Sequence, residues 1–269
     1  LIILLAVACL IALCAGQYSV SVPEVIKILA SRFVNVTKTW SNTAEGVVFT
    51  LRLPRIIGAV LVGSALSLSG AAYQGVFKNP LVAPDLLGVS SGACVGASVA
   101  ILLHLNSFGV QAMAFVAGIL AVGLTLFIPR LIKNTNMTML VLSGIIVKGI
   151  MDSVMGIIKY VADPETELQS ITYWQLGSLT KVLPKDLFTV GPVIVAASVI
   201  IFLLRWRINI LSLGDREAKT LGVSVTIVRN FIIICATLLT ASAVCISGTI
   251  GWIGLVIPHF ARMLTGPDN

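Results

Sequence analysis

The run "IIGAVLVGSALSLSGAAYQGVF" (residues 56–77) contains no charged side chain over 22 residues. An α-helix needs about 20 apolar residues to cross the hydrocarbon core of a bilayer. Because lipid offers the backbone no hydrogen-bond partner, such a segment crosses the membrane as a helix. Three further runs are similarly poor in charge, at residues 86–129, 187–204 and 230–261. The pattern predicts an α-helical protein that crosses the bilayer several times.

The composition supports this prediction. Hydrophobic residues make up 57% of the 269 residues and charged residues only 11%, whereas a soluble domain carries about 25% charged residues. We therefore predict an all-α, polytopic membrane protein, a helical bundle that forms one transmembrane domain over residues 1–269. The expected spans lie at about residues 1–16, 56–77, 86–103, 110–129, 138–160, 187–204, 230–248 and 253–264.

The charged and reactive residues argue against several classes of protein. The net charge of +7 indicates contact with anionic membrane lipid, and no cluster of Lys, Arg and aromatic residues supports nucleic-acid binding. The five cysteines lie in apolar runs without CxxC or His-paired spacing, so no metal site is expected. The sequence has neither a GxxxxGK[ST] phosphate-binding loop nor a Ser/His/Asp constellation. We therefore do not expect this chain to be an enzyme.

Two segments that align without a gap, residues 66–88 and 244–266, suggest an internal repeat. The matched pairs are Ser69 with Ser247, Gly70 with Gly248, Pro80 with Pro258 and Gly88 with Gly266. An odd number of expected spans separates the segments, so the two copies would run in opposite directions, as in inverted-repeat transporters. Coincidence is the alternative, because Gly and Pro are frequent in membrane helices. The residues predicted to break helices or to allow close packing are Ser69, Gly70, Asn79, Pro80, Pro84, Gly88, Gly248 and Pro258.

The motif "RLPR" (52–55) stands directly before the first uncharged run. Pro54 fits the first turn of a helix, where its missing N–H costs no hydrogen bond. Arg52 and Arg55 are three residues apart and are predicted to share one helical face. They either anchor the helix in lipid headgroups or dock acidic residues of a partner, since Arg forms bidentate pairs with carboxylates.

Two ionisable residues, Lys148 and Asp152, lie four residues apart inside an expected span. At this spacing they can neutralise each other on one helix face. The alternative is a proton or ion relay, because ionisable residues within the membrane are often functional.

The most polar stretch of the chain, "LSLGDREAKTLGV" (211–223), places four charges in five positions, with Leu213, Ala218 and Leu221 among them. It is either a solvated loop or an amphipathic docking segment whose apolar residues a partner buries. Gly214 and Gly222 can supply sharp turns at its two edges.

Together, four motifs resemble the FecCD family of permeases from ATP-binding-cassette importers. They are "LRLPR" (51–55), "SGAAYQGVFKNPLVAPDLLGVSSGA" (69–93), "LSLGDREAKTLGV" (211–223) and "SGTIGWIGLVIPHFARMLTG" (247–266). Members of the family take up ferric siderophores, haem, cobalamin and, in some cases, oxyanions. The resemblance extends over essentially the whole chain and implies a transport subunit.

The family fold has ten spans, and two permeases form a dimer around a central path. The resemblance therefore implies that about eight of the ten spans are present, with the last two beyond residue 269. It implies repeat halves at about 52–160 and 225–269, the second of them incomplete. It also implies a bacterial or archaeal plasma (inner) membrane, surrounding lipid, and a second permease copy or a paralogue as partner, most simply a homodimer.

The resemblance also assigns roles to individual residues. The polar stretch would form coupling helices in a cleft of a cytosolic ATP-binding subunit, which binds ATP and Mg, so that no cofactor is expected in this chain. The contact residues would be Leu213, Gly214, Asp215, Arg216, Glu217, Ala218, Leu221 and Gly222. Arg52 and Arg55 would face acidic residues of an extracytoplasmic substrate-binding protein. Met137 and Thr138 would lie at the cytosolic gate, although they differ from the small polar pair of some relatives.

We expect an ATP-driven importer of an iron complex such as a ferric siderophore, because that cargo is common in the family. Cobalamin, haem and oxyanion permeases of the same family are the alternatives within this class. The alternative from another class is an ion-gradient-driven secondary transporter that uses Lys148 and Asp152.

Overall fold

The computed structural model describes residues 1–134 and 136–266, and within them it consists of helices and loops without any strand. The chain forms two compact units. The first comprises Leu1–Val60 and Leu179–Thr189, and the second comprises Leu61–Ser178 and Val190–Asn269. Two helices, α4 (Leu53–Phe77) and α9 (Pro184–Leu203), have residues in both units. The assignment of the chain to one transmembrane domain stays a prediction.

The first unit is built on short helices around a small apolar cluster. Its helices are α1 (Ile2–Cys14), α2 (Val22–Ala30), α3 (Asn42–Gly46) and the π-helical segment η1 (Val47–Arg52). Val25 and Ile28 on one face of α2 are fully buried and pack with Leu13 of α1 and Val48 of η1. The apolar spacing of α2 thus joins it to α1 and η1.

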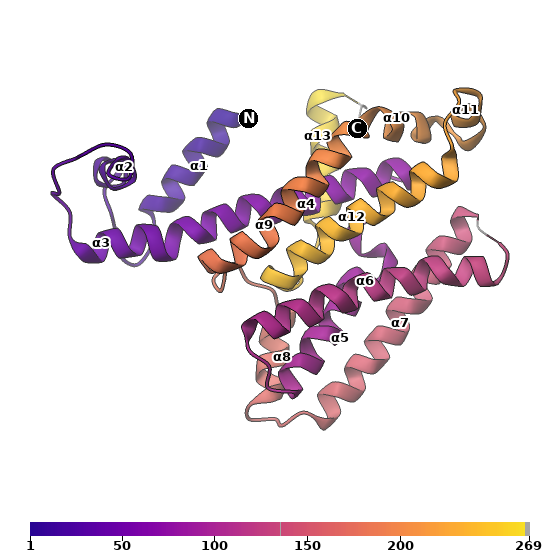
Figure 1. The fold of residues 1–269 in the computed structure, drawn as a ribbon, viewed down its shortest axis with the longest axis horizontal. Coiled ribbons are helices and arrows are strands. Elements are labelled where there is room, and N and C mark those ends of the chain that lie inside the picture. The colour runs from indigo at the N-terminus through magenta and orange to yellow at the C-terminus, as the bar shows by residue number, and fades with distance from the viewer. Residues whose placement is uncertain (135, 267–269) are drawn as a thin grey trace. The chain divides into compact units, whose positions relative to one another are not determined.

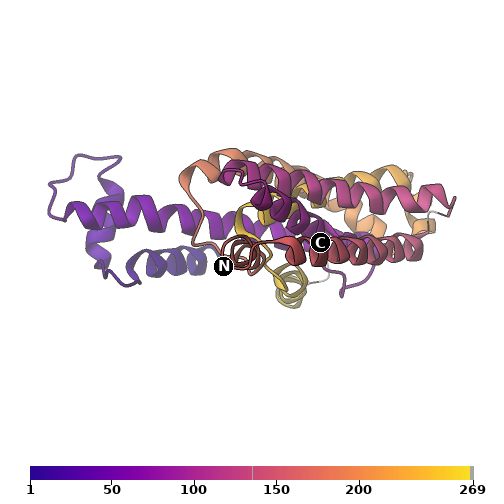
Figure 2. The ribbon, with the colours of Figure 1, turned by 90° about the horizontal axis from the view of Figure 1, so that it is seen from below.

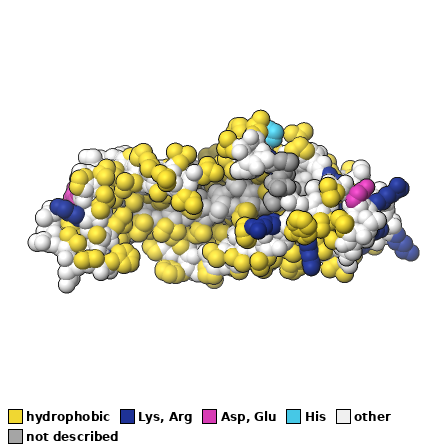
Figure 3. All heavy atoms as spheres, turned by 90° about the horizontal axis from the view of Figure 1, so that it is seen from above, with side chains coloured by type: hydrophobic (Ala, Val, Ile, Leu, Met, Phe, Trp, Pro, Cys, Tyr) yellow, Lys and Arg dark blue, Asp and Glu magenta, His cyan; other side chains and the backbone are white. Residues whose placement is uncertain are grey.

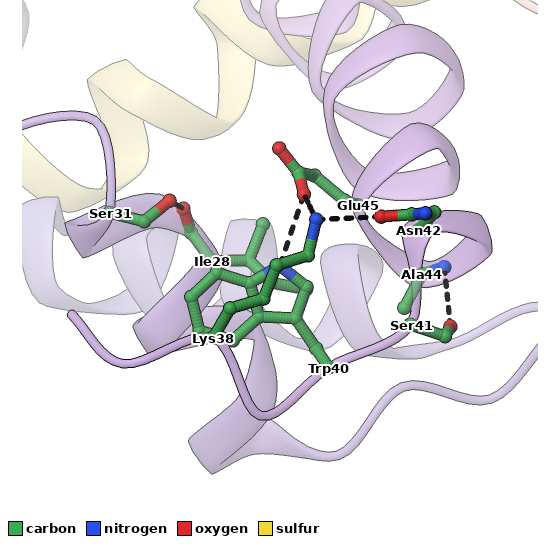
Figure 4. A network of polar contacts seen from close by, with 8 residues as sticks. All are labelled: Ile28, Ser31, Lys38, Trp40, Ser41, Asn42, Ala44 and Glu45. Carbon is green, nitrogen blue, oxygen red and sulfur yellow. Dashed lines mark hydrogen bonds and ion pairs between the residues drawn. The ribbon is translucent and has the colours of Figure 1, made fainter.

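A polar network closes the loop before α3 (Figure 4). Lys38 Nζ donates to Asn42 Oδ1 at 2.7 Å and forms an ion pair with Glu45 Oε2 at 2.7 Å. Trp40 Nε1 donates to the same carboxylate oxygen at 3.3 Å. Ser41 accepts a hydrogen bond from the backbone N–H of Ala44, as an N-cap residue does.

Besides parts of α4 and α9, the described part of the second unit contains eight helices. They are α5 (Val89–Leu102), α6 (Ser107–Leu131), α7 (Met137–Val161), α8 (Glu167–Gln175), α10 (Arg205–Leu213), α11 (Asp215–Thr220), α12 (Val225–Ser247) and α13 (Ile253–Thr265), with the 3₁₀ turn η2 (Pro84–Leu87) before α5. α6 lies beside α5, α7 and α12 (Figures 1 and 2). In the most apolar 18-residue stretch of α12, 78% is buried, so this helix is central to the unit.

Small residues determine how closely α5 and α6 approach. A Cβ atom added to Gly96 would lie 2.3 Å from the carbonyl oxygen of Met113, and one on Gly92 would lie 2.5 Å from the Cβ of Ala121. Helices pack this closely in membranes when small residues line the contact, because lipid provides no hydrophobic drive for association.

The expected spans all coincide with helices, but their lengths differ. Within the described residues, five helical stretches are long and apolar enough to cross a membrane: Asn42–Phe77, Ser107–Leu131, Met137–Val161, Pro184–Leu203 and Val225–Ser247. The other three, α1, α5 and α13, have only 13 or 14 residues. At 1.5 Å per residue each is about 20 Å long, which is shorter than a hydrocarbon core of about 30 Å. Hydrophobic side chains predominate on the face drawn in Figure 3.

Pro54 lies in the first turn of α4, as predicted, but the helical run is continuous from Asn42 through η1 into α4. In η1 the backbone N–H of Leu53 donates to the carbonyl of Val48, five residues earlier. A proline lacks the N–H that an α-helix requires and clashes with the preceding turn. The wider π turn just before Pro54 accommodates that residue without ending the helix.

The aligned segments 66–88 and 244–266 do not place their matched residues in the same local structure. Gly70 lies inside α4, whereas its counterpart Gly248 ends α12 with φ +69°. Pro80 follows α4 in a loop, whereas Pro258 lies inside α13. Gly70 and Pro258 are therefore not at helix breaks, which corrects that part of the assignment. The division into inverted halves stays a prediction.

Candidate functional site

The stretch 211–223 forms two short helices joined by a glycine. Gly214, between α10 and α11, has φ +149°, and a Cβ there would lie 1.9 Å from Glu217 Oε2. Gly222 follows α11 with φ +76°. Both glycines therefore stand where side chains are disfavoured, which agrees with the prediction of turns at the two edges of the stretch.

Not all of the predicted contact residues face outward. The side chains of Leu213 and Leu221 are 66% and 59% exposed, and those of Arg216, Glu217 and Lys219 are also exposed. We call these five residues the α10–α11 patch. Ala218 is fully buried within the chain itself, which corrects the expectation that a partner would bury it.

Asp215 points toward its own chain and joins three segments. Its Oδ1 atom accepts from Lys78 Nζ at 3.0 Å, just after α4, and from Arg229 Nη2 at 2.7 Å, on α12. Partial burial raises the pKa of Asp215, but the hydrogen bonds from Arg229 and Lys78 outweigh that effect and hold the pKa below its usual value. A lowered pKa means that the two ion pairs are present at neutral pH and are lost only as the pH falls through that pKa.

The structure gives Arg52 and Arg55 different surroundings. The guanidinium of Arg52 donates to the carbonyl oxygens of Leu13 and Cys14, at the end of α1, and to that of Tyr18. Basic groups are favourable at a helix C-terminus, where the last carbonyls lack partners. Within the described residues Arg55 makes no hydrogen bond or ion pair. Of the two, only Arg55 has a guanidinium free to meet a partner.

Met137 and Thr138 begin α7. Asn136 caps this helix by accepting from the backbone N–H of Met139 at 2.8 Å. The side chain of Thr138 is exposed. Met137 lines a small cavity of about 80 Å³ together with Arg130 and Arg229. Met137 is thus close to Arg229, which holds Asp215. The gate role of the two residues stays a prediction.

The pairing expected between Lys148 and Asp152 is not what the structure shows. Lys148 Nζ forms an ion pair with Asp85 Oδ2 at 3.1 Å, and Asp85 Oδ1 accepts from the backbone N–H of Ser90 at 3.0 Å. Asp85 therefore caps the start of α5 and ties it to α7. Asp152 faces a cavity instead. The sequence spacing suggested the wrong partner because Asp85 lies 63 positions from Lys148.

That cavity lies in the second unit and has a volume of about 340 Å³. Its walls come from α4, η2, α5, α7, α8, α12, the segment before α13 and the start of α13. Its polar lining residues are Asp85, Ser90, Ser91, Cys94, Asp152, Gln175, Thr240, Thr249 and Trp252. Of these residues only Asp152 was predicted to be functional, because the others come from segments far apart in the chain and belong to no recognisable ligand motif.

Several predicted packing residues do lie at close contacts. Ser69 is fully buried, donates to the carbonyl of Leu66 and accepts from Thr240 Oγ1 at 3.1 Å. A Cβ on Gly70 would lie 1.8 Å from the carbonyl oxygen of Gly254, so α4 and α13 are in backbone contact there.

The loop between α4 and α5 is shaped by residues with restricted backbones. Asn79 accepts from the backbone N–H of Leu81 at 2.9 Å, which is an Asx turn. Pro80 lies within this turn, and Pro84 begins η2. Gly88 has φ +81° between η2 and α5. The helical structure is therefore interrupted between α4 and α5, as predicted.

Gln74 is a buried polar residue that sequence analysis did not select. Its Nε2 atom donates to the carbonyl of Leu255 at 3.2 Å, and its Oε1 atom accepts from Arg262. Both partners belong to α13. In the sequence it is a glutamine inside a long apolar run, within the motif at 69–93, and such a residue is costly in a membrane unless it is hydrogen-bonded.

Because the part of the chain that the structure describes has five helices long and apolar enough to cross a bilayer, and many large hydrophobic residues are exposed, the chain is a multi-pass integral membrane protein. Residues 4–269 match the model of the FecCD transport family. The chain is 37% identical over 270 residues to the molybdate import system permease protein MolB of Haemophilus influenzae, covering 100% of this chain and 79% of that protein. It is 41% identical over 222 residues to a probable iron chelatin transport system permease protein of Helicobacter pylori, covering 82% of this chain and 67% of that protein.

A solved structure agrees with these relatives. It is described as an inward-facing conformation of a metal-chelate type ABC transporter, and it superposes with a TM-score of 0.87 at 34% identity, covering 99% of this chain and 80% of that one. This chain therefore belongs to the FecCD transport family, and it is an ABC importer permease. The alternative of an ion-gradient-driven secondary transporter is overturned by this membership.

Proposed function

We propose that this chain is the membrane-spanning permease of an ATP-driven importer that takes up an iron complex through the plasma (inner) membrane of a bacterium or archaeon. A separate cytosolic subunit binds ATP and Mg, an extracytoplasmic protein delivers the cargo, and a second permease, most simply an identical copy, completes the path. Met137 and Thr138 are assigned to the cytosolic gate of that path.

The observation that carries this proposal is the α10–α11 patch. Leu213 and Leu221 are exposed on a segment that the salt bridges of Asp215 hold to the membrane helices. The charged residues Arg216, Glu217 and Lys219 surround them. Apolar anchors inside a polar rim are typical of a protein–protein contact. The patch fits the binding of an ATPase subunit that must hold the permease and move its helices.

The iron complex is supported by the relative named for iron chelatin transport. The relative named for molybdate import, whose similarity covers all of this chain, supports an oxyanion as the second candidate. Two carboxylates, Asp85 and Asp152, line the large cavity of the second unit. Asp85 is neutralised by its ion pair with Lys148, whereas Asp152 has no ion pair within the described residues. The negative charge of Asp152 disfavours a free oxyanion, and on this ground we place the iron complex first.

Uptake by the reconstituted complex tests both parts of the proposal. The permease, ATPase and binding protein would be placed in proteoliposomes and offered a labelled ferric siderophore, haem, cobalamin or molybdate. We expect uptake of the ferric siderophore that requires both enclosed ATP and the binding protein. ATP-dependent uptake of molybdate alone would replace the iron complex by the oxyanion. Uptake driven by an ion gradient without ATP would contradict the proposed function as a whole.

A charge reversal at Arg55 tests the docking of the binding protein. Arg55→Glu should raise the Kd of the binding protein for the complex about tenfold at low salt, because interfacial charges guide association. The effect should shrink at about 1 M salt, where the Debye length is about 3 Å. Titrating ATPase stimulation with the binding protein measures it, with Lys27→Glu, a charge reversal on the exposed face of α2, as the control. An effect that does not change with salt would leave Arg55 as a lipid anchor.

A further inference from the structure

Asp215 stands where the α10–α11 patch meets two long helices. Its carboxylate is bound by Lys78, the residue after α4, and by Arg229 on α12, 137 and 14 positions away. Ion pairs between exposed groups contribute little to stability. The side chain of Arg229, however, is only 13% exposed, and hydrogen bonds between charged groups are about twice as strong as neutral ones.

The two ion pairs of Asp215 connect the α10–α11 patch to α12 and to the end of α4. α11 packs against α10 and α12, with Ala218 fully buried on its inner face. The Lys78 ion pair adds a connection to the end of α4. A displacement of α11 must therefore move Arg229, Lys78 or both, or it must break the ion pairs.

The connection continues beyond Lys78. Gln74 lies one turn earlier, on α4, and binds Leu255 and Arg262 of α13. Leu255 and its neighbour Gly254 line the large cavity of the second unit. A series of polar contacts thus runs from the patch through α4 to the wall of this cavity.

We propose that Asp215 is a positioning residue that transmits movement of the α10–α11 patch to α4 and α12, and through Gln74 to α13 at the cavity. This inference rests on the proposed function, in which the ATPase moves the patch. Docking itself belongs to Leu213 and Leu221, whose side chains face outward, whereas the Asp215 carboxylate is bound by its own chain. Loss of the carboxylate charge should therefore separate ATP hydrolysis from transport without releasing the ATPase.

The test is the variant Asp215→Asn, which keeps the shape of the side chain and removes its charge. In the complete complex we would measure ATPase co-purification, ATP hydrolysis, and cargo molecules taken up per ATP hydrolysed. Co-purification and hydrolysis should stay within about twofold, while uptake per ATP should fall at least about fivefold, the lower end of typical coupling between sites. Asp215→Glu, which restores the charge, should recover most of the loss.

A double-mutant cycle ties the effect to the ion pair with Lys78. Lys78→Met should also lower uptake per ATP, and the variant with both changes should lose no more than the larger single effect, because both act on one contact. Lys38→Met, which removes the Lys38–Glu45 ion pair of the first unit, is the matched control and should leave uptake per ATP unchanged. Spatial connection alone does not prove coupling, and the cycle supplies the direct measurement.

The outcomes separate this inference from the proposed function. If Asp215→Asn releases the ATPase, the residue belongs to the docking contact and the inference is overturned. The same holds if uptake per ATP is unchanged, or if the effects of the Asp215 and Lys78 variants simply add. If the unmodified complex takes up no cargo with ATP, the proposed function itself fails. Melting temperatures of all variants identify any that lose uptake through unfolding, and Asp215→Glu then serves as the folded comparison.

Discussion

Replacing Leu213 and Leu221 together by aspartate should abolish co-purification of the ATPase and leave the permease folded. Both side chains are more than half exposed, so the change costs the permease little by itself. In the complex, each carboxylate would be buried without a partner in the cleft of the ATPase. Interfacial anchors of this kind contribute about 2–4 kcal/mol each, and a loss of about 4 kcal/mol in total is already a factor of about a thousand in Kd.

Leu103→Asp is the matched control for this pair. Leu103 is 61% exposed at the end of α5, so the variant introduces the same charge on a leucine of similar exposure elsewhere in the second unit. Pull-down of the ATPase with the tagged permease in detergent gives the answer, with size-exclusion profiles to check the fold. Full retention of the ATPase by the double variant would show that the α10–α11 patch is not the docking surface.

The sequence predicted the helices and the broken loop well, since both depend on local pattern. The charge-free runs gave the positions of α4, α6, α9 and α12 because a bilayer requires apolar length. The turn residues Asn79, Pro84 and Gly88 placed the break after α4, because each restricts the backbone by itself. The polar stretch 211–223 was likewise recognised from its own composition.

Partners distant in sequence could not be predicted in this way. Lys148 was paired with Asp152 by helical spacing, but the fold brings Asp85 to it from the loop before α5. Arg52 was predicted to meet lipid headgroups or acidic residues of a partner, but its guanidinium binds the carbonyl oxygens at the end of α1. Each of these contacts exists only after helices have packed, so neither residue type nor spacing reveals it.

The same reason explains the missed residues. Gln74 lies within the motif at 69–93 without being singled out there, Gln175 lies in no motif, and the contacts of both follow from which helices come together. For Ala218, which was predicted to contact a partner, the residue type allowed two positions. Its small apolar side chain fits both the inner and the outer face of α11, and only the packing decides that it is buried.

Gly70→Ala should prevent the second unit from reaching its native packing. The added Cβ would lie 1.8 Å from the carbonyl oxygen and 2.7 Å from the carbonyl carbon of Gly254. Both are backbone atoms, so no side chain can rotate away, and α4 and α13 must separate. Overpacking in a core commonly costs about 1–3 kcal/mol, and the loss here should reach or exceed the upper end of that range. The expected result is a large fall in melting temperature in detergent, together with a poor yield.

Gly63→Ala provides the control within the same helix, because a Cβ at that position would have no neighbour within 4 Å. It should leave the melting temperature unchanged or slightly higher, since alanine favours helix more than glycine does. A thiol-reactive dye can follow unfolding, because Cys94, Cys235 and Cys245 are buried in the second unit. If Gly70→Ala melts at the same temperature as Gly63→Ala, α4 and α13 do not make this backbone contact. The route inferred from Asp215 through Gln74 to α13 would then lose its second step, since Gln74 lies one turn from Gly70.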